Sequence, residues 1–144
     1  MIAADKAMAL APSPVIEVAP EQVGLTGLDS FFWLGQSPSP ISATARVSGL
    51  TVTAEARPTE YVWDFGDGQE EVTTEPGRPW TRTSEGSISH LYETKGSYDL
   101  SVEIIWRARW QADDGPWQQL GMFSNSAGES YPVKEVVSVL VSTE

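Results

Sequence analysis

The chain has 144 residues, a hydrophobic fraction of 40% and a formal net charge of −11 at pH 7, values that fit one globular domain. This acidic balance argues against nucleic-acid binding and against an anionic membrane surface, because both need clustered Lys and Arg. The absence of cysteine excludes a disulfide framework. No run of about 18 apolar residues occurs, so we expect no membrane insertion by this chain.

The N-terminal segment differs in composition from the rest of the chain. Residues 1–22 are rich in Ala and Pro and predict an extended arm or linker, followed by one sandwich domain over residues 23–144. Residues 1–12 lack a basic stretch followed by a clean apolar one, so we do not expect a signal peptide there. The sequence is equally compatible with a fragment of a longer protein.

The next part of the chain alternates apolar and polar residues with a period of two, which predicts β-strands. Residues 41–47 and 50–56 are expected to form a hairpin around the turn at Ser48–Gly49. A corner is expected at residues 57–59. Residues 69–89 are polar and predict a long surface loop with a short strand over 70–74.

The clearest alternation covers residues 98–110. A strand of this length spans about 44 Å, so we expect it to bend or to switch sheets. A returning strand over 117–123, a turn over 124–128 and a last strand over 131–141 complete the pattern. The sequence therefore predicts an all-β, immunoglobulin-like sandwich of about seven to eight antiparallel strands with an extended N-terminal arm.

Two motifs in this pattern resemble the polycystic-kidney-disease (PKD) domain family. Residues 61–68 read YVWDFGDG and residues 90–102 read HLYETKGSYDLSV, about 22 residues further on. The signature positions are Trp63, Asp64, Phe65, Gly66, Asp67, Gly68, His90, Tyr92, Gly96 and Tyr98. The resemblance covers roughly residues 41–106, and it implies a non-catalytic sandwich used extracellularly for adhesion, spacing or protein contact. Residues 24–34 and 106–110 further resemble a group of actinobacterial PKD-domain proteins of unknown function.

Asp64 and Asp67 carry two open interpretations. Carboxylates three residues apart can converge on one calcium ion, with Asp99, Asp113 or Asp114 as a further ligand. Alternatively, they accept hydrogen bonds from backbone N–H groups in a tight turn, which is the commoner use of Asp beside Gly. We favour the turn. We expect no cofactor, with bound calcium as the alternative.

No catalytic constellation is expected. Residues 64–66 spell DFG, but the chain is too short for a kinase and has no Gly-rich phosphate loop. His90 is the only histidine, and Ser87 or Ser89 could be combined with it and Asp67, but no nucleophile elbow exists. The favoured role for His90 is to lock a turn together with Tyr92.

The six tryptophans are the other candidate for function. Trp63 and Trp106 lie on apolar strand faces and are expected in the core. For Trp80, Trp110 and Trp117 we favour ordinary core packing at the wide end of the sandwich. The alternative is a ligand platform formed by Trp80, Trp110, Trp117, Arg107 and Arg109. The resemblance to PKD domains implies a non-catalytic module of a secreted or cell-surface protein, for protein contact or spacing. The alternative is a carbohydrate-binding module with a Trp platform, so the partner is a protein or a polysaccharide.

Overall fold

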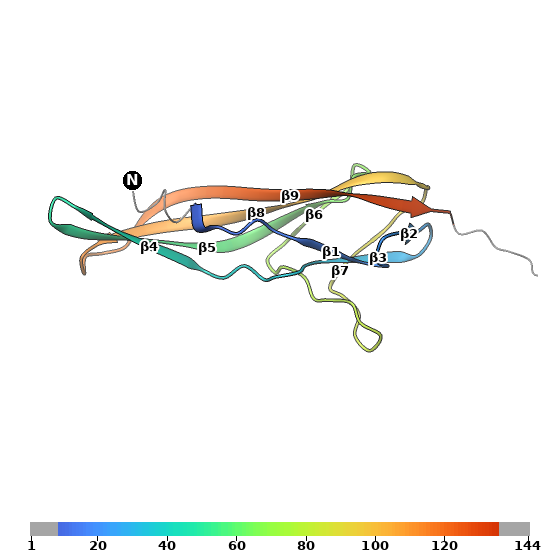
Figure 1. Ribbon diagram of the computed structural model, residues 1–144, viewed down its shortest axis with the longest axis horizontal. Helices are drawn as coiled ribbons and strands as arrows, with labels where there is room; N and C mark the ends of the chain where they lie inside the picture. Colours follow the sequence, from blue (N-terminus) through green and yellow to red (C-terminus); the bar gives the residue numbers. More distant parts are fainter. Residues whose placement is uncertain (1–8, 136–144) are drawn as a thin grey trace, which may run out of the picture.

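The computed structural model describes residues 9–135 as an elongated molecule of nine strands in two sheets (Figure 1). The larger sheet has the order β2-β9-β8-β5-β4, with β6 also paired to β5. Its strands are β2 (Gly24–Leu25), β4 (Ile41–Val47), β5 (Leu50–Asp64), β6 (Glu70–Thr73), β8 (Gly96–Ala112) and β9 (Gln118–Lys134). The smaller sheet has the order β1-β3-β7, formed by β1 (Ile16–Ala19), β3 (Asp29–Leu34) and β7 (Ile88–Leu91).

The two sheets differ in length. Strands β5, β8 and β9 run along most of the molecule, whereas β1, β3 and β7 lie beside only one half of it (Figure 1). The sandwich class is confirmed. The strand count is nine in the described residues rather than seven or eight, and β2 pairs with β9 in parallel while the other strand pairs are antiparallel.

Aromatic side chains fill the space between the sheets. Five of them are at most 1% exposed: Phe32, Trp63, Tyr92, Trp106 and Tyr131. Burial of such a side chain contributes about 1.5–3 kcal/mol relative to an exposed position. The prediction that Trp63 and Trp106 belong to the core is confirmed.

Strand β8 confirms the alternation predicted for residues 98–110. Its even-numbered residues Leu100, Val102, Ile104, Trp106 and Ala108 are buried, and the residues between them face away from the core. Of the two alternatives expected for this strand, a bend or a switch between sheets, the switch is excluded, because β8 pairs with β9 along its length with one irregularity after Ala108.

The expected corner at residues 57–59 was also wrong. Strand β5 continues from the hairpin into the YVWD segment without ending. A bulge between Pro58 and Glu60 accommodates the proline, which cannot donate to the ladder.

The C-terminal strands were predicted as two and are one. Residues 124–128, expected as a turn, lie inside β9. Their polarity misled the prediction: Asn125 binds the indole of Trp106, and a Cβ on Gly128 would lie 2.9 Å from the Leu100 carbonyl oxygen. The expected last strand ends at Lys134 in the described chain, and its residues 136–141 lie outside the described residues.

The segment predicted as an arm contributes to the sandwich. Strand β1 pairs with β3, and its Ile16 is 7% exposed. Just before it, the Pro12 carbonyl accepts a hydrogen bond of 2.8 Å from Asn125. The sandwich therefore begins no later than Ile16, rather than at residue 23.

Candidate functional site

The first signature motif forms a tight turn where β5 ends. Asp64 Oδ1 accepts a hydrogen bond from the Gly66 N–H at 2.8 Å, and Asp67 Oδ1 accepts one from the Gln69 N–H at 3.1 Å. Gly66 has φ of +84°, and a Cβ there would lie 2.7 Å from backbone atoms of Asp99. Only glycine fits this close approach.

The second motif locks onto the first. The Tyr92 hydroxyl donates to the Phe65 carbonyl at 2.7 Å, and His90 Nε2 lies 2.6 Å from Asp67 Oδ2. The imidazole of His90 stacks on the Phe65 ring with a centroid distance of 4.2 Å. His90 is therefore engaged in a structural contact between the two motifs.

Tyr92 is held as a neutral donor in this cluster. Burial raises the pKa of its hydroxyl, and the Asp67 carboxylate adds to the effect. Its ring packs 4.4 Å from that of Tyr98, whose hydroxyl donates to the Thr94 carbonyl at 2.6 Å. The signature residues thus form one connected unit around the turn.

Of the candidate calcium ligands, Asp64, Asp67 and Asp99 lie around the same turn, whereas Asp113 and Asp114 lie in the turn between β8 and β9. Asp64 and Asp67 have the backbone hydrogen bonds given above, and the backbone of Asp99 packs against Gly66. Within residues 9–135, no three His, Cys, Asp or Glu side chains gather in a way that could hold a metal ion. Calcium binding stays a prediction.

The candidate platform is divided between surfaces. Trp110 faces the inner side of the large sheet and packs near Val52 and Ala54. Arg109, the preceding residue, faces the outer side, where its guanidinium lies 4.1 Å from the Trp117 ring centroid. Trp80 lies in the loop after β6, stacked on Phe31 of the smaller sheet.

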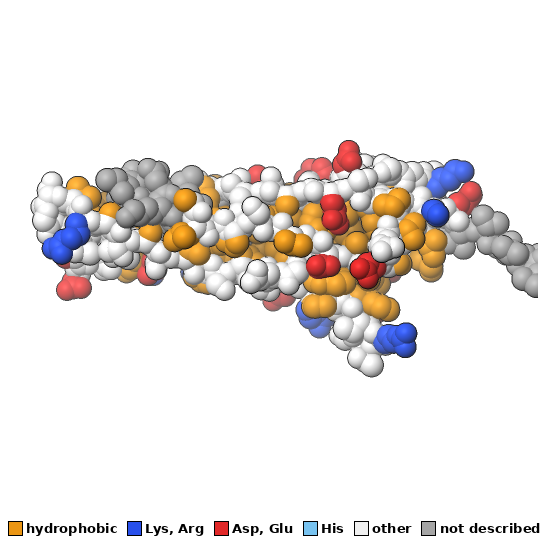
Figure 2. Space-filling view, in the orientation of Figure 1, with side chains coloured by type: hydrophobic (Ala, Val, Ile, Leu, Met, Phe, Trp, Pro, Cys, Tyr) orange, Lys and Arg blue, Asp and Glu red, His pale blue; other side chains and the backbone are white. Residues whose placement is uncertain are grey.

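The loop that carries Trp80 lies against the smaller sheet. The Leu34 N–H donates to the Pro76 carbonyl at 3.0 Å, and the Trp80 and Phe31 ring centroids are 6.5 Å apart. Trp80 remains 40% exposed. In the space-filling view, hydrophobic side chains gather where the protruding loop meets the body, with acidic side chains beside them (Figure 2).

The outer side of β5, β8 and β9 brings together the other platform residues. We call this surface the basic face and define it by Arg57, Arg107, Arg109, Trp117 and Met122. Arg57 is paired in register with Arg107, and Arg107 with Met122, which is 62% exposed. Of these five residues, the sequence did not single out Arg57 and Met122.

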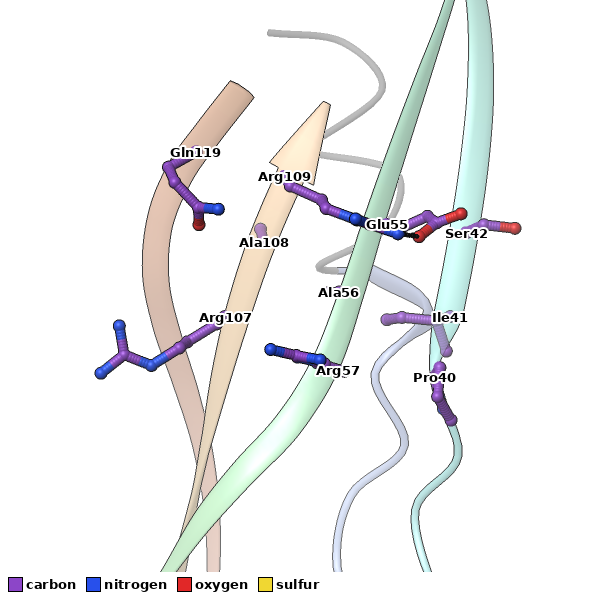
Figure 3. Close-up of a pocket in the computed structure, with 10 residues that line it drawn as sticks. All are labelled: Pro40, Ile41, Ser42, Glu55, Ala56, Arg57, Arg107, Ala108, Arg109 and Gln119. Carbon is purple, nitrogen blue, oxygen red and sulfur yellow. Dashed lines mark hydrogen bonds and ion pairs between the residues drawn. The ribbon is translucent and has the colours of Figure 1, made fainter. Parts of the chain in front are cut away.

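An ion pair between Arg109 and Glu55 lies on the basic face. Arg109 Nε and Nη2 both donate to Glu55 Oε2, at 3.2 and 2.9 Å. Because Arg109 also lies over Trp117, one guanidinium links an acidic and an aromatic side chain. A pocket of about 450 Å³ opens here, and its lining includes Glu55, Arg57, Arg107, Arg109 and Gln119 (Figure 3).

No helix among residues 9–135 has the length and apolar character needed to cross a membrane. A search of curated proteins finds no match to the chain. The sequence model of the PKD domain family matches residues 32–113, more than half of the chain. This match covers both linked motifs and most of the large sheet, and with the observed sandwich it shows that the chain belongs to the PKD domain family.

Proposed function

We propose that this chain is a binding module of a secreted or cell-surface protein and that it contacts a protein partner through the basic face. PKD domains are generally non-catalytic immunoglobulin-like modules. Within such a module, the function depends on which part of the surface is arranged for contact.

The observation that carries the proposal is the assembly of Arg109, Trp117 and Met122 on one solvent-facing side of the long strands. Arg, Trp and Met are enriched at protein interfaces, and Trp and Arg are enriched among the residues that contribute most binding energy. Glu55 and Trp117 fix the Arg109 side chain before any partner arrives. Such preorganisation lowers the entropy lost on binding.

Carbohydrate binding has less support from the geometry. A sugar platform needs aromatic rings that share one surface, and Trp80, Trp110 and Trp117 lie on three different ones. The outer side of the long strands, rather than the short turn between β8 and β9 at residues 113–117, is the better candidate surface.

The test is site-specific photo-crosslinking in the native host. A photoreactive amino acid replaces Met122 in the full protein, and the control replaces Leu28, which is 51% exposed on a different part of the molecule. We expect a defined protein adduct from position 122 that is absent from position 28 and weakened by Arg109→Gln. Identical adducts from both positions, or an adduct that does not depend on Arg109, would contradict the proposal.

A further inference from the structure

We propose that Arg57 and Arg107 form a subsite for the carboxylate groups of an acidic segment on the protein partner. This inference rests on the proposed function and assigns a chemistry to the partner surface. It concerns the part of the basic face that the contacts within the described chain leave without a counter-ion.

The two arginines lie directly opposite each other on neighbouring strands. Arg57 of β5 and Arg107 of β8 are register partners, and both side chains are exposed. In the close-up both extend toward the β9 side (Figure 3). Like charges in directly opposed positions destabilise a sheet, so this pair works against the stability of the unliganded module.

Neither arginine has an acidic partner within residues 9–135. The ion pairs in this part of the chain are His90–Asp67 and Arg109–Glu55. Glu60 and Glu103 lie further along the same side of β5 and β8, and neither forms an ion pair with another described residue. Glu55 is the one acidic residue in the pocket lining, and Arg109 already binds it.

The local charge is opposite to that of the molecule. The pocket contains three of the nine Lys and Arg residues of a chain whose net charge is −11. With one Glu against three Arg, the pocket has a local excess of positive charge. A cationic site on an acidic body guides an approaching anion to one place and repels it elsewhere.

The neighbouring Arg109 shows what a guanidinium on this sheet can do. Its Nε and Nη2 both donate to Glu55 Oε2 across the same pair of strands. Arg57 and Arg107, one step further along the face, present the same planar donors without an acidic acceptor among residues 9–135. A guanidinium matches carboxylate and phosphate groups through two parallel hydrogen bonds.

The apolar neighbour favours a peptide over a sugar acid. Met122 is the register partner of Arg107 on the other side and is 62% exposed. An acidic peptide can cover this thioether with an apolar side chain while its carboxylates bind the arginines. An acidic polysaccharide would leave that surface without a matching group.

The test measures binding of an oligo-glutamate peptide by calorimetric titration, with polygalacturonate and inorganic phosphate as competing probes. The variant R57Q/R107Q is compared with R78Q/R82Q, which removes two arginines from the loop after β6 and so leaves the same net charge. We expect R57Q/R107Q to weaken peptide binding at least about tenfold, and the loop variant to change it less than about twofold. R57K/R107K, which keeps the charge and loses the planar fork, should restore part of the affinity.

Equal losses in the two double variants, or tighter binding of polygalacturonate or phosphate than of the peptide, would overturn the inference. Circular dichroism and the unfolding temperature establish that each variant is folded. The cross-link from position 122 separates this inference from the proposed function. An adduct that survives R57Q/R107Q overturns the subsite alone, whereas arginine-dependent peptide binding without any adduct from position 122 overturns the protein-contact function alone.

Discussion

Trp106 Nε1 donates a hydrogen bond of 3.0 Å to Asn125 Oδ1, and the Asn125 amide donates one of 2.8 Å to the Pro12 carbonyl. One side chain on β9 thus joins the most deeply buried tryptophan to the segment that leads into β1. The polar residue that looks like part of a turn in the sequence is a structural bridge in the fold.

Asn125→Ala should reduce the free energy of unfolding by about 1–3 kcal/mol, because it leaves a buried indole N–H without an acceptor. Urea unfolding followed by Trp fluorescence measures the change. Ser126→Ala, at an exposed neighbouring position, is the control and should stay within about 0.5 kcal/mol of the parent protein. A control as destabilising as Asn125→Ala would show that the strand, and not the hydrogen bond, is responsible.

Asp67→Ala should destabilise the protein by about 1–3 kcal/mol, since it removes both the acceptor for the Gln69 N–H and the partner of His90. Chemical denaturation gives the difference. The matched change is Asp114→Ala, which removes the same charge from an exposed position in the turn between β8 and β9. We expect little effect there, and comparable losses at both sites would mean that charge alone is being measured.

Arg57→Gln should raise the free energy of unfolding by about 0.2–1 kcal/mol, because it relieves the repulsion between the opposed arginines. The gain should shrink as salt concentration increases. Arg46→Gln, on the exposed end of β4, is the control; because Arg46 lies opposite Thr51, we expect no such gain there. A loss of stability in Arg57→Gln at low salt would contradict the repulsion between Arg57 and Arg107.

Alkaline pH should destabilise the fold through its buried phenols. Burial raises the pKa of Tyr61, Tyr92 and Tyr131 above the ordinary value of 10.0. The unfolded chain therefore loses these protons first, and stability that is intact below pH 10 falls as the pH rises beyond it. Tyrosinate absorbance and circular dichroism recorded together should show most ionisation appearing with unfolding. Ionisation of Tyr61, Tyr92 and Tyr131 in a still-folded protein would be inconsistent with these shifts.

Millimolar calcium should leave the unfolding temperature unchanged, because Asp64 and Asp67 already accept backbone hydrogen bonds within the turn. A thermal melt with calcium and one with a chelator provide the comparison. An increase of several degrees that disappears in Asp64→Asn would instead establish the calcium site.

The parts of the fold that depend on neighbouring residues in sequence could be predicted. The alternation of apolar and polar residues identified β8, because successive side chains of a strand point to opposite faces of the sheet. The two motifs identified the turn, because their residues contact one another. The basic face could not be predicted in full. The pairing of Arg57 with Arg107 depends on the register between β5 and β8, which includes a bulge at Pro58. A polar run such as residues 124–128 indicates a strand only when its partner strand is known.

The full-length pairing of β9 with β8 also determines how the module responds to tension. Every register pair from Gly96–Val133 to Trp110–Gln118 lies along one antiparallel ladder, whose hydrogen bonds run perpendicular to the strands. A pull on Lys134 along the axis of β9 therefore loads these bonds in shear, all at the same time, instead of opening them one by one. The same strand pairing that displays the basic face therefore makes β9 resistant to being pulled out of the sheet.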